Sequence, residues 1–436
     1  MIHFRPPCLE NTLEIDKYGL VVTGQARRCR RERTELLFEC RFEKPDSQCR
    51  ACEGTGRVRG SESRTVVHAP IGTRPVHLLL RLRQFICRVC GAYWREQPGD
   101  LLPNAGGKLT RNAVTWALVA VVLDAMSIQA ASRNLGAWWN TVNDAVLTAG
   151  YEYLVADETR FEGVKTIGVD EHCWSHKGRY NQKLVTVVMD LTPRQYGRPA
   201  RLLDMIPGRS KQVFKTWLNQ QTQEFRDGVE VVAMDGFTGY KTAALEALGP
   251  VTTVMDPFHV VQLAGEKLTQ CRQRTQQETL GRRGRSGDPL FAARKALLTS
   301  EKYLSPRGWD KVQQVITKHT GLFRIWAVYQ SIIAAYRNPD KQEGRQHLTA
   351  VIDALDTVNT KGIPELATLR RTLKRRRKDI LAYFTNPFSS NGPSEAINGR
   401  LEHLRGIALG FRNIQNYITR SLLHTGGFRK QVQALL

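Results

Sequence analysis

The sequence lacks any long uninterrupted hydrophobic run. Its longest apolar stretch, Ala113 to Met126, is interrupted by Asp124, and it is shorter than the roughly 20 residues that a membrane-spanning helix needs. The beginning of the chain has no basic segment followed by an apolar one, as a secretion signal would have. We therefore expect a cytoplasmic protein with no membrane partner.

Acidic residues are few relative to basic ones. The chain has 41 Asp and Glu against 64 Lys and Arg, which gives a formal net charge of +23. An excess of one sign repels itself in a compact state, and phosphates of a nucleic acid would neutralise it. Composition therefore favours a polyanionic partner, and the 436 residues are enough for about two to four domains.

Cysteine is also scarce. There are nine cysteines, an odd number, and most lie early in the chain, which suits a reducing compartment better than a disulfide framework. Two pairs, Cys49/Cys52 and Cys87/Cys90, share the Cys-x-x-Cys spacing, and two such turns can offer four thiolates to one Zn²⁺. Buried thiols or a redox pair are the alternatives. Residues 53–86 also form a longer gap than zinc ribbons usually have.

Residues 1–100 are rich in arginine and contain strand-like segments, so we expect short strands around the metal in a zinc-ribbon DNA-binding region. Residues 101–158 begin with apolar residues at helical spacing from Leu109 to Ala125. Ser127 is then placed to cap a second helix. This change of pattern predicts a separate helical module after the ribbon.

The helical module has the spacing of a helix-turn-helix. Ser132 is small enough for two helices to cross, Gly136 can adopt positive φ in the turn, and Val142 lies at a core position. The second helix would present side chains near its start to a DNA groove. These side chains are Trp139, Asn140, Thr141 and Asn143. A helical hairpin that binds no DNA is the alternative.

Strand-like and helical segments alternate over residues 159–262, which predicts a mixed sheet covered by helices. Asp170 ends the first strand and Asp235 the fourth, so we expect both carboxylates to emerge where a sheet edge meets solvent and could hold a metal ion. As alternatives, Asp235 begins an ordinary turn and Asp170 caps one. The predicted strands are KTIGVDEHCW, QKLVTVVMDLT, ARLLDMIP, VEVVAMDG and VTTVMD, with helices around Val213–Arg226 and Tyr240–Leu248.

Residues 263–384 have helical patterns throughout, including Trp309–Lys318, Leu322–Tyr336 and Gln346–Thr357, and predict an all-α insertion. Two basic clusters lie in it. A solvated charged face is the usual interpretation, but with no acidic partners nearby we expect phosphate contacts. The proposed contacts are Arg282, Arg283, Arg285, Arg370, Arg371, Lys374, Arg375, Arg376, Arg377 and Lys378.

The last segment, residues 385–436, contains a helix that Asn391 or Ser394 could cap. Four side chains project from one face of this helix at spacings of three, four and three residues. In order, they are a carboxylate, an amide, a second carboxylate and a cation. They are Glu395, Asn398, Glu402 and Arg405. Such a face suits a metal-and-phosphate site, whereas an exposed helix with ordinary salt bridges is the alternative.

These motifs together resemble the bacterial insertion-sequence transposases of the ISL-three group, which belong to the ribonuclease-H-like DDE class. The resemblance rests on the ribbon, the helix-turn-helix, IGVDEHCW, VVAMDGFTGY, VMDPFHVVQ and SNGPSEAINGRLEHLRGIALGFRN. It implies a multidomain protein with a ribonuclease-H-like α/β domain interrupted by the all-α insertion. It also implies that Asp170, Asp235 and Glu395 are the catalytic triad, supported by Asp256 and His259.

The expected activity is cleavage of double-stranded DNA at terminal inverted repeats and strand transfer to target DNA. Three carboxylates could hold Mg²⁺ or Mn²⁺, which favour oxygen ligands, while the ribbon holds Zn²⁺. Glu171 is expected on the opposite face of the strand from Asp170. We expect a homo-oligomer, a dimer, on nucleoid DNA. A nuclease that cuts without joining, or a catalytically inactive DNA-binding regulator, are the alternatives.

Overall fold

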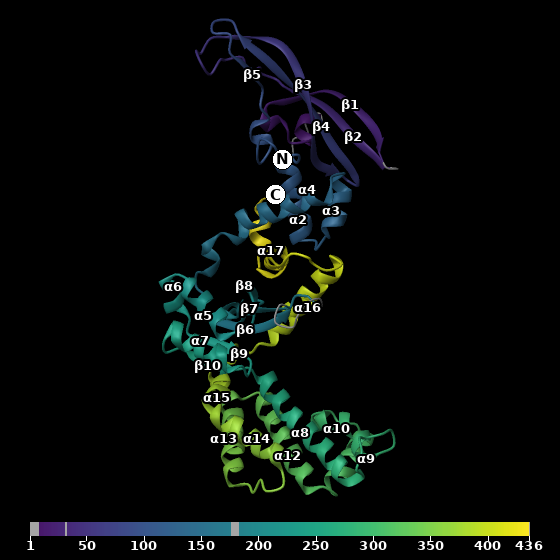
Figure 1. Cartoon of the computed structure of the whole chain (residues 1–436), viewed down its shortest axis with the longest axis vertical. Helices are drawn as coiled ribbons and strands as arrows, with labels where there is room; N and C mark the ends of the chain where they lie inside the picture. The colour runs from purple at the N-terminus through teal and green to yellow at the C-terminus, as the bar shows by residue number, and fades with distance from the viewer. Residues whose placement is uncertain (1–7, 31–32, 176–182, 436) are drawn as a thin grey trace, which may run out of the picture. The chain divides into compact units, whose positions relative to one another are not determined.

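The computed structural model describes residues 8–30, 33–175 and 183–435 (Figure 1). The chain divides into two compact units. One comprises Met1–Glu158 with Leu404–Leu436, and the other comprises Thr159–His403. In the described part of the chain, no helix is both long and apolar enough to cross a membrane.

The first unit contains a five-stranded sheet in the order β1-β2-β4-β3, with β5 paired to β4. The strands are β1 (Leu20–Arg30), β2 (Arg33–Phe42), β3 (Gly56–Ile71), β4 (Arg74–Cys87) and β5 (Tyr93–Arg95), accompanied by α1 (Leu9–Thr12), η1 (Asp16–Tyr18) and η2 (Gly99–Leu101). Alternate residues of β4, such as Leu78, Leu80 and Leu82, are buried in the core. The expectation of short strands is wrong, because β3 and β4 have 16 and 14 residues.

Helices follow this sheet. They are α2 (Arg111–Val122), α3 (Ile128–Leu135), α4 (Trp139–Gly150) and the π-helical turn η3 (Tyr151–Val155), and α17 (Ile414–Thr425) and α18 (Arg429–Gln433) pack against them. The predicted cap is confirmed, since Ser127 Oγ accepts a hydrogen bond from Ala130 N at 3.1 Å. Ser132 and Val142 are buried, and Gly136 has φ +64°. A Cβ on Gly136 would lie 2.8 Å from Pro75 Cβ, so glycine also lets this turn pack on β4.

The second unit contains a mixed sheet in the order β10-β9-β6-β7-β8. Its strands, β6 (Thr166–Cys173), β7 (Leu184–Asp190), β8 (Arg201–Pro207), β9 (Val231–Met234) and β10 (Thr252–Met255), confirm the five predicted ones. β7 is antiparallel to β6 and β8 is antiparallel to β7, whereas β9 is parallel to β6 and β10 is parallel to β9. The short helices η4 (Glu158–Phe161) and η6 (Thr192–Tyr196) lie before β6 and before β8.

Helices cover both faces of this sheet (Figure 1). One face carries α5 (Lys211–Gln220), α6 (Gln223–Gly228) and α7 (Thr238–Leu248), and the other carries α16 (Gly392–Ile407). The single helix predicted around Val213–Arg226 is two helices. The break occurs where Thr222 caps α6 by accepting a hydrogen bond from Phe225 N.

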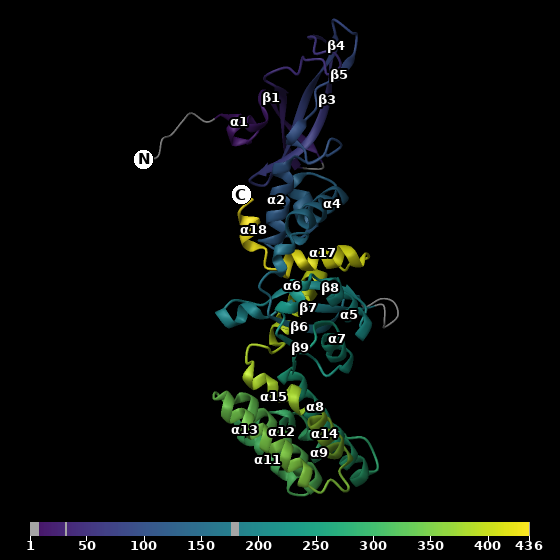
Figure 2. The ribbon, with the colours of Figure 1, turned by 90° about the vertical axis from the view of Figure 1, so that its left-hand side faces the viewer.

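A helical bundle extends the second unit (Figure 2). It consists of α8 (Pro257–Leu280), α9 (Pro289–Ala292), α10 (Arg294–Leu298), η7 (Glu301–Tyr303), α11 (Pro306–Ile316), α12 (Thr320–Arg337), α13 (Lys341–Thr357), α14 (Pro364–Arg375) and α15 (Arg377–Thr385). Trp326 belongs to its core and Trp309 packs on that core, with ring centroids 5.9 Å apart. Helix α8 is continuous from the end of β10 into the bundle, across residue 262.

A buried polar network joins this bundle to the sheet. The carboxylate of Asp379 accepts from Lys241 Nζ at 2.6 and 2.8 Å and from Thr253 Oγ1 at 2.8 Å. Arg376 Nη1 donates to the same carboxylate at 3.2 Å, and its Nη2 donates to the carbonyl of Gly236 at 2.9 Å. Since Asp379 is only 2% exposed, its charge depends on these partners.

We predict that Asp379→Ala destabilises the protein by about 3 kcal/mol or more, because it leaves buried cations without their counter-charge. The measurement is the free energy of unfolding from urea denaturation. Asp353→Ala is the matched control, because Asp353 pairs with Arg377 at the surface of the same bundle. A surface pair contributes little, so equal effects of the two substitutions would contradict this account.

Candidate metal and nucleic-acid sites

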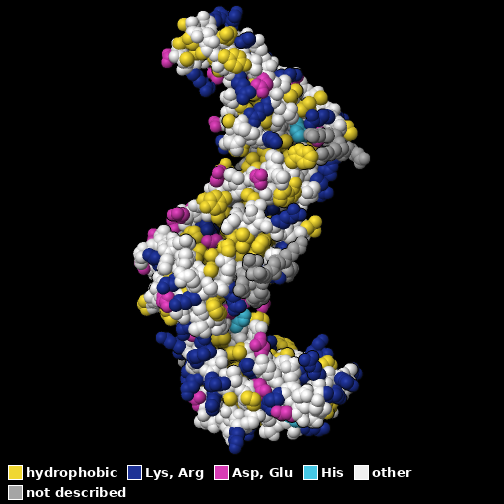
Figure 3. Space-filling view, viewed as in Figure 1, with side chains coloured by type: hydrophobic (Ala, Val, Ile, Leu, Met, Phe, Trp, Pro, Cys, Tyr) yellow, Lys and Arg dark blue, Asp and Glu magenta, His cyan; other side chains and the backbone are white. Residues whose placement is uncertain are grey.

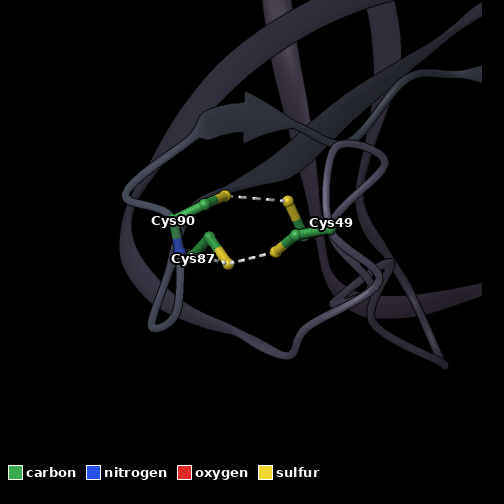
Figure 4. Close-up of side chains that lie close together, drawn as sticks. Cys49, Cys87 and Cys90 are labelled. Atoms are coloured by element: carbon green, nitrogen blue, oxygen red, sulfur yellow. Dashed lines mark hydrogen bonds between the residues drawn. The ribbon is translucent and has the colours of Figure 1, made fainter.

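Four cysteine sulfurs converge at one end of the first sheet (Figure 4). The Sγ atoms of Cys49 and Cys90 are 3.7 Å apart, those of Cys52 and Cys87 are 3.4 Å apart, and all four lie within 4.8 Å of one another. A tetrahedral zinc with Zn–S bonds of about 2.3 Å requires sulfur separations of roughly 3.8 Å. The cluster therefore has the dimensions of a Cys₄ zinc site.

Backbone hydrogen bonds favour the thiolate form of one of these cysteines, Cys87. Cys87 Sγ accepts hydrogen bonds from the N–H groups of Cys90 and Val89, which lower its pKa to about 6. Gly54 makes room for the cluster, because a Cβ there would lie 2.9 Å from Val89 Cγ2 and 3.3 Å from Cys52 Sγ. A low thiol pKa favours the thiolate that coordinates zinc.

The long gap between the two pairs is a β-hairpin. Strand β3 begins just after the first pair and β4 ends at Cys87, and the register pairs Gly56 with Cys87. The chain therefore leaves the metal site along β3 and returns to it along β4. The unusual spacing in the sequence reflects the length of this hairpin and does not separate the two pairs in space.

The register of the second sheet places Asp170 beside Asp235. Strands β6 and β9 are parallel, and Val169 lies opposite Met234. Asp170 follows Val169 and Asp235 follows Met234, so the two aspartates come next to each other. β6 and β9 are interior strands of the sheet. Asp235 directly follows β9, as predicted, but Asp170 does not end its strand, since β6 continues to Cys173.

Burial and neighbouring carboxylates shift the pKa of Asp170. Burial raises the pKa of Asp170 to about 6, and the charges of Asp235 and Glu171 act in the same direction. A hydrogen bond from the backbone N–H of Glu171 at 2.8 Å and the imidazole of His259 act against this shift. The site therefore concentrates negative charge that a cation would stabilise.

Glu171 is linked to this site through a shared arginine. Arg209, in the loop between β8 and α5, forms an ion pair with Glu171 and lies 3.9 Å from Asp235 Oδ2. Burial raises the pKa of Glu171, and the charge of Asp235 adds to this effect. Although alternation directs Glu171 away from Asp170, one guanidinium links it to Asp235. The expected position of Glu171 on the opposite face of β6 is therefore compatible with a link to Asp235 through Arg209.

Helix α16 lies against β6 along one face. Asn391 Nδ2 donates to the carbonyl of Val169 at 3.2 Å, and Asn398 Nδ2 donates to Asp170 Oδ2 at 3.4 Å. Further along, Glu402 lies 3.9 Å from His172. A Cβ at Gly168 would lie 3.0 Å from Asn391 Oδ1, so glycine there permits this close approach.

Glu395 projects from the same face of α16, because it lies four residues after Asn391 and three before Asn398. Its side chain is exposed. Among the described residues, only the four cysteines form a group of three or more potential ligands close enough to share one ion. The structure thus brings Asp170 and Asp235 together and puts Glu395 on the facing helix, without closing a three-carboxylate cluster.

Several buried polar atoms beside these carboxylates have no partner. Within the described ranges, no hydrogen bond reaches Asn391 Oδ1, Ser394 Oγ or Asn398 Oδ1. Such groups are costly to bury unless something satisfies them. Carboxylate, amide and hydroxyl oxygens are the ligand types that Mg²⁺ or Mn²⁺ prefers. The residues present therefore suit a hard divalent cation.

Asp256 has a structural role at this site. Its Oδ2 caps α8 by accepting from Phe258 N at 3.1 Å and His259 N at 3.4 Å, while Oδ1 accepts from Asn391 N at 2.7 Å. Asp256 is 2% exposed. It fixes the start of α16 relative to α8 and so positions His259 and Asn391 beside the acidic residues.

The predicted recognition helix exposes most of its expected side chains. Trp139 and Asn140 are exposed and Thr141 is partly exposed at the start of α4. Asn143 is different, since it is only 5% exposed and its amide donates to Asp144 Oδ1 at 3.2 Å. The prediction that Asn143 faces a DNA groove is therefore wrong, because its position on α4 faces the core.

The basic clusters are more neutralised than the sequence suggested. Arg282 pairs with Asp288, Lys374 with Asp356 and Arg377 with Asp353. Arg376 is 6% exposed and lies in the network around Asp379, so its predicted DNA contact is wrong. Arg376 also marks the break between α14 and α15, so this basic cluster is divided between two helices.

Other cations remain at the surface. The exposed ones are Arg283, Arg285, Arg371, Arg375 and Lys378, while Arg370 and Arg405 are partly exposed. Lys and Arg side chains are spread over the visible face of both units, with fewer Asp and Glu among them (Figure 3).

Sequence reasoning missed Arg209 and the anchoring role of Asn391. No motif marks Arg209, because its importance arises only when the loop after β8 folds beside β9. Asn391 had a signal, since Asn-Gly-Pro-Ser precedes the helix. That signal led us to expect Asn391 to cap α16. In the structure, its side-chain amide instead donates a hydrogen bond to the carbonyl of Val169.

Comparison with known proteins agrees with this architecture. A protein-family model described as "Transposase" matches residues 167–421, and one described as "zinc-finger of transposase IS204/IS1001/IS1096/IS1165" matches residues 44–90. The chain thus combines a zinc-ribbon region with a region of a transposase family. It belongs to the ISL-three family of insertion-sequence transposases.

Relatives from two strains of Mycobacterium tuberculosis, CDC 1551 / Oshkosh and ATCC 25618 / H37Rv, have the name "Transposase for insertion sequence element IS1557". Each is 26% identical to this chain over 290 residues, which cover 62% of this chain. The match also spans only 62% of the length of each relative.

We predict that the purified protein holds about one tightly bound zinc per chain and that Cys87→Ser with Cys90→Ser abolishes it, because two thiolates cannot retain the ion. Metal analysis after gel filtration measures the zinc content. Cys173→Ser, outside the cluster, is the control and should keep full zinc content. Full retention in the double variant would contradict a four-thiolate site.

Proposed function

We propose that this protein is a DNA transposase that binds the terminal inverted repeats of an insertion sequence and catalyses DNA cleavage and strand transfer. The observation that carries the proposal is the register of β6 and β9, which puts Asp170 beside Asp235. Helix α16 then presents Glu395 from the face that contacts β6. Family membership supports the same reaction class.

The second unit is, in this proposal, a ribonuclease-H-like domain. Its sheet order supports this assignment, because three consecutive antiparallel strands are followed by two parallel strands on the other side of β6. The helices α8–α15 interrupt the domain between its second and third carboxylates. Asp256 joins the two sides of that interruption through Asn391 N.

Asp170, Asp235 and Glu395 would hold Mg²⁺ or Mn²⁺, which supplies Lewis-acid activation of the attacking oxygen and stabilisation of the leaving one. Asn398 orients Asp170 through its hydrogen bond to Oδ2, and Arg209 restrains Asp235. The same carboxylates can serve hydrolysis at the element's end and attack by the freed 3′-hydroxyl on target DNA. No covalent protein intermediate is needed.

DNA recognition is assigned to the first unit. Helices α3 and α4 form a helix-turn-helix in this proposal, with Asn140 and Thr141 reading base edges. The exposed cations of the helical bundle contact phosphates and fix the DNA without reading its sequence. Because two ends of an element must be cut and joined, we propose that the protein acts as a dimer on DNA.

We predict that Asp170→Asn, Asp235→Asn and Glu395→Gln each reduce DNA cleavage at least about a hundredfold, because each removes one anionic metal ligand. Binding of the terminal-repeat duplex should persist. The assay follows Mg²⁺- or Mn²⁺-dependent cleavage of an end-containing duplex and its joining to a second DNA.

Two amide substitutions control this experiment. Glu246→Gln changes a surface carboxylate that pairs with Lys211 and Lys215, and Glu402→Gln changes one on the same helix as Glu395. Both should keep substantial activity. Loss of activity in Glu402→Gln with normal activity in Glu395→Gln would identify Glu402 as the third carboxylate. Cleavage without any joining would instead indicate a nuclease.

A second prediction separates phosphate contacts from base contacts. Arg371→Ala, Arg375→Ala and Lys378→Ala together should weaken binding to all DNA and flatten its salt dependence. Asn140→Ala or Thr141→Ala should reduce discrimination between the element's end and random DNA by about 1–3 kcal/mol. Titrations of both DNAs at several salt concentrations measure both effects. An equal loss on both DNAs from the α4 substitutions would exclude α4 as the recognition helix.

A further inference from the structure

A groove of about 750 Å³ lies in the first unit where the helix-turn-helix packs on the sheet. Its floor is apolar and includes Val67, Pro75 and Ala137. Gly136 packs directly on Pro75 beside this floor, since a Cβ on Gly136 would lie 2.8 Å from Pro75 Cβ.

The walls of the groove are basic. Arg33, Lys108 and Arg133 line it and are exposed. Arg33 Nη1 donates to the carbonyl of Arg133 at 3.1 Å, so the beginning of β2 and the end of α3 are joined across it. Glu35 also lines the groove, but its charge is balanced by Arg28 at 2.8 Å. A net positive charge remains, which attracts an anionic ligand.

Two aromatic rings stand at the rim. Trp138 and Trp139 are 63% and 44% exposed, an uncommon exposure for the largest apolar side chains. They begin α4, a helix of 12 residues whose N-terminus has no side-chain cap. Its first N–H groups and the helix dipole favour a phosphate. The groove thus combines cations, phosphate-binding N–H groups and faces on which a base can stack.

Size decides which form of DNA fits. The major groove of a double helix is by itself about 12 Å wide, so a whole duplex does not fit inside a groove of about 750 Å³. That volume lies within the range of about 300–1,000 Å³ that accommodates small ligands such as one or two nucleotides. A purely electrostatic phosphate site would gain nothing from two exposed tryptophans. The occupant that matches both size and chemistry is an unpaired nucleotide.

We propose that this groove binds an unstacked nucleotide of single-stranded DNA, with Trp138 as the stacking surface and Lys108 and Arg133 on the adjoining phosphates. The proposal rests on the proposed function in taking DNA as the partner. It adds that the DNA-binding unit recognises an unpaired base next to the duplex that α4 reads.

The probe is a single-stranded DNA of about ten nucleotides carrying one 2-aminopurine, a length within the range that single-strand sites occupy. The full-length protein should change the fluorescence of 2-aminopurine on binding, because stacking alters its emission. Trp138→Ala should weaken binding at least about fivefold and remove this change, since one stacked base contributes about 1–3 kcal/mol. Trp138→Phe should retain both, whereas Trp138→Leu should not.

The contribution of the groove's positive charge is tested by substituting cations inside and outside the groove. Lys108→Ala and Arg133→Ala should weaken binding of the probe and lower its salt dependence. Arg27→Ala is the control, because Arg27 is exposed on β1 one residue from Arg28 but does not line the groove. An equal loss in Arg27→Ala would mean diffuse electrostatic attraction and would overturn the site.

Three other outcomes also overturn the inference. They are unchanged binding by Trp138→Ala, equal competition by a duplex of the same length, and tighter binding of an RNA strand of the same sequence. Asp170→Asn should bind the probe normally. A probe response without any cleavage activity would contradict the proposed function alone, whereas cleavage without a probe response would contradict this inference alone.

Discussion

The parallel pairing of β6 with β9 is the constraint on which the acidic site depends. Pairing of Val169 with Met234 makes Asp170 and Asp235 neighbours although residues 171–234 separate them in sequence. A slip of one residue would direct each side chain to the other face of the sheet. The buried apolar residues of both strands oppose that slip, because it would turn side chains that are packed on one face of the sheet toward the other face. The hydrophobic core therefore fixes the distance between two charged groups.

A second constraint keeps α16 against this sheet across the long helical insertion. Asp256 receives hydrogen bonds from the first turn of α8 and from Asn391 at the start of α16, so one carboxylate joins both ends of the interruption. Asp379 adds a second connection, since Arg376 reaches the carbonyl of Gly236 directly after Asp235. A long insertion at this point is tolerated because its two ends are tied together beside the acidic residues.

Local patterns in the sequence predicted much of this arrangement. Apolar runs bounded by turn residues identified all five strands of the second sheet, and the cap at Ser127 followed from its side chain alone. Long-range partners could not be read in the same way. Asn143 and Arg376 looked accessible by residue type, yet both are buried. Likewise, the role of Arg209 depends on two loops that meet only in the folded chain, and the aspartates' proximity depends on strand order.

The basic residues show most clearly that a sequence does not reveal long-range partners. The net charge of +23 suggested that every basic cluster faces a polyanion. The structure instead uses Arg282, Lys374 and Arg377 in ion pairs with nearby aspartates. Cations that bind phosphates must keep exposed donors, whereas those that stabilise the fold are already partnered. Residues such as Arg375 and Lys108 remain exposed. The positive charge that a polyanion could contact therefore lies on particular surfaces of each unit, and the net charge of the whole chain does not reveal where these surfaces are.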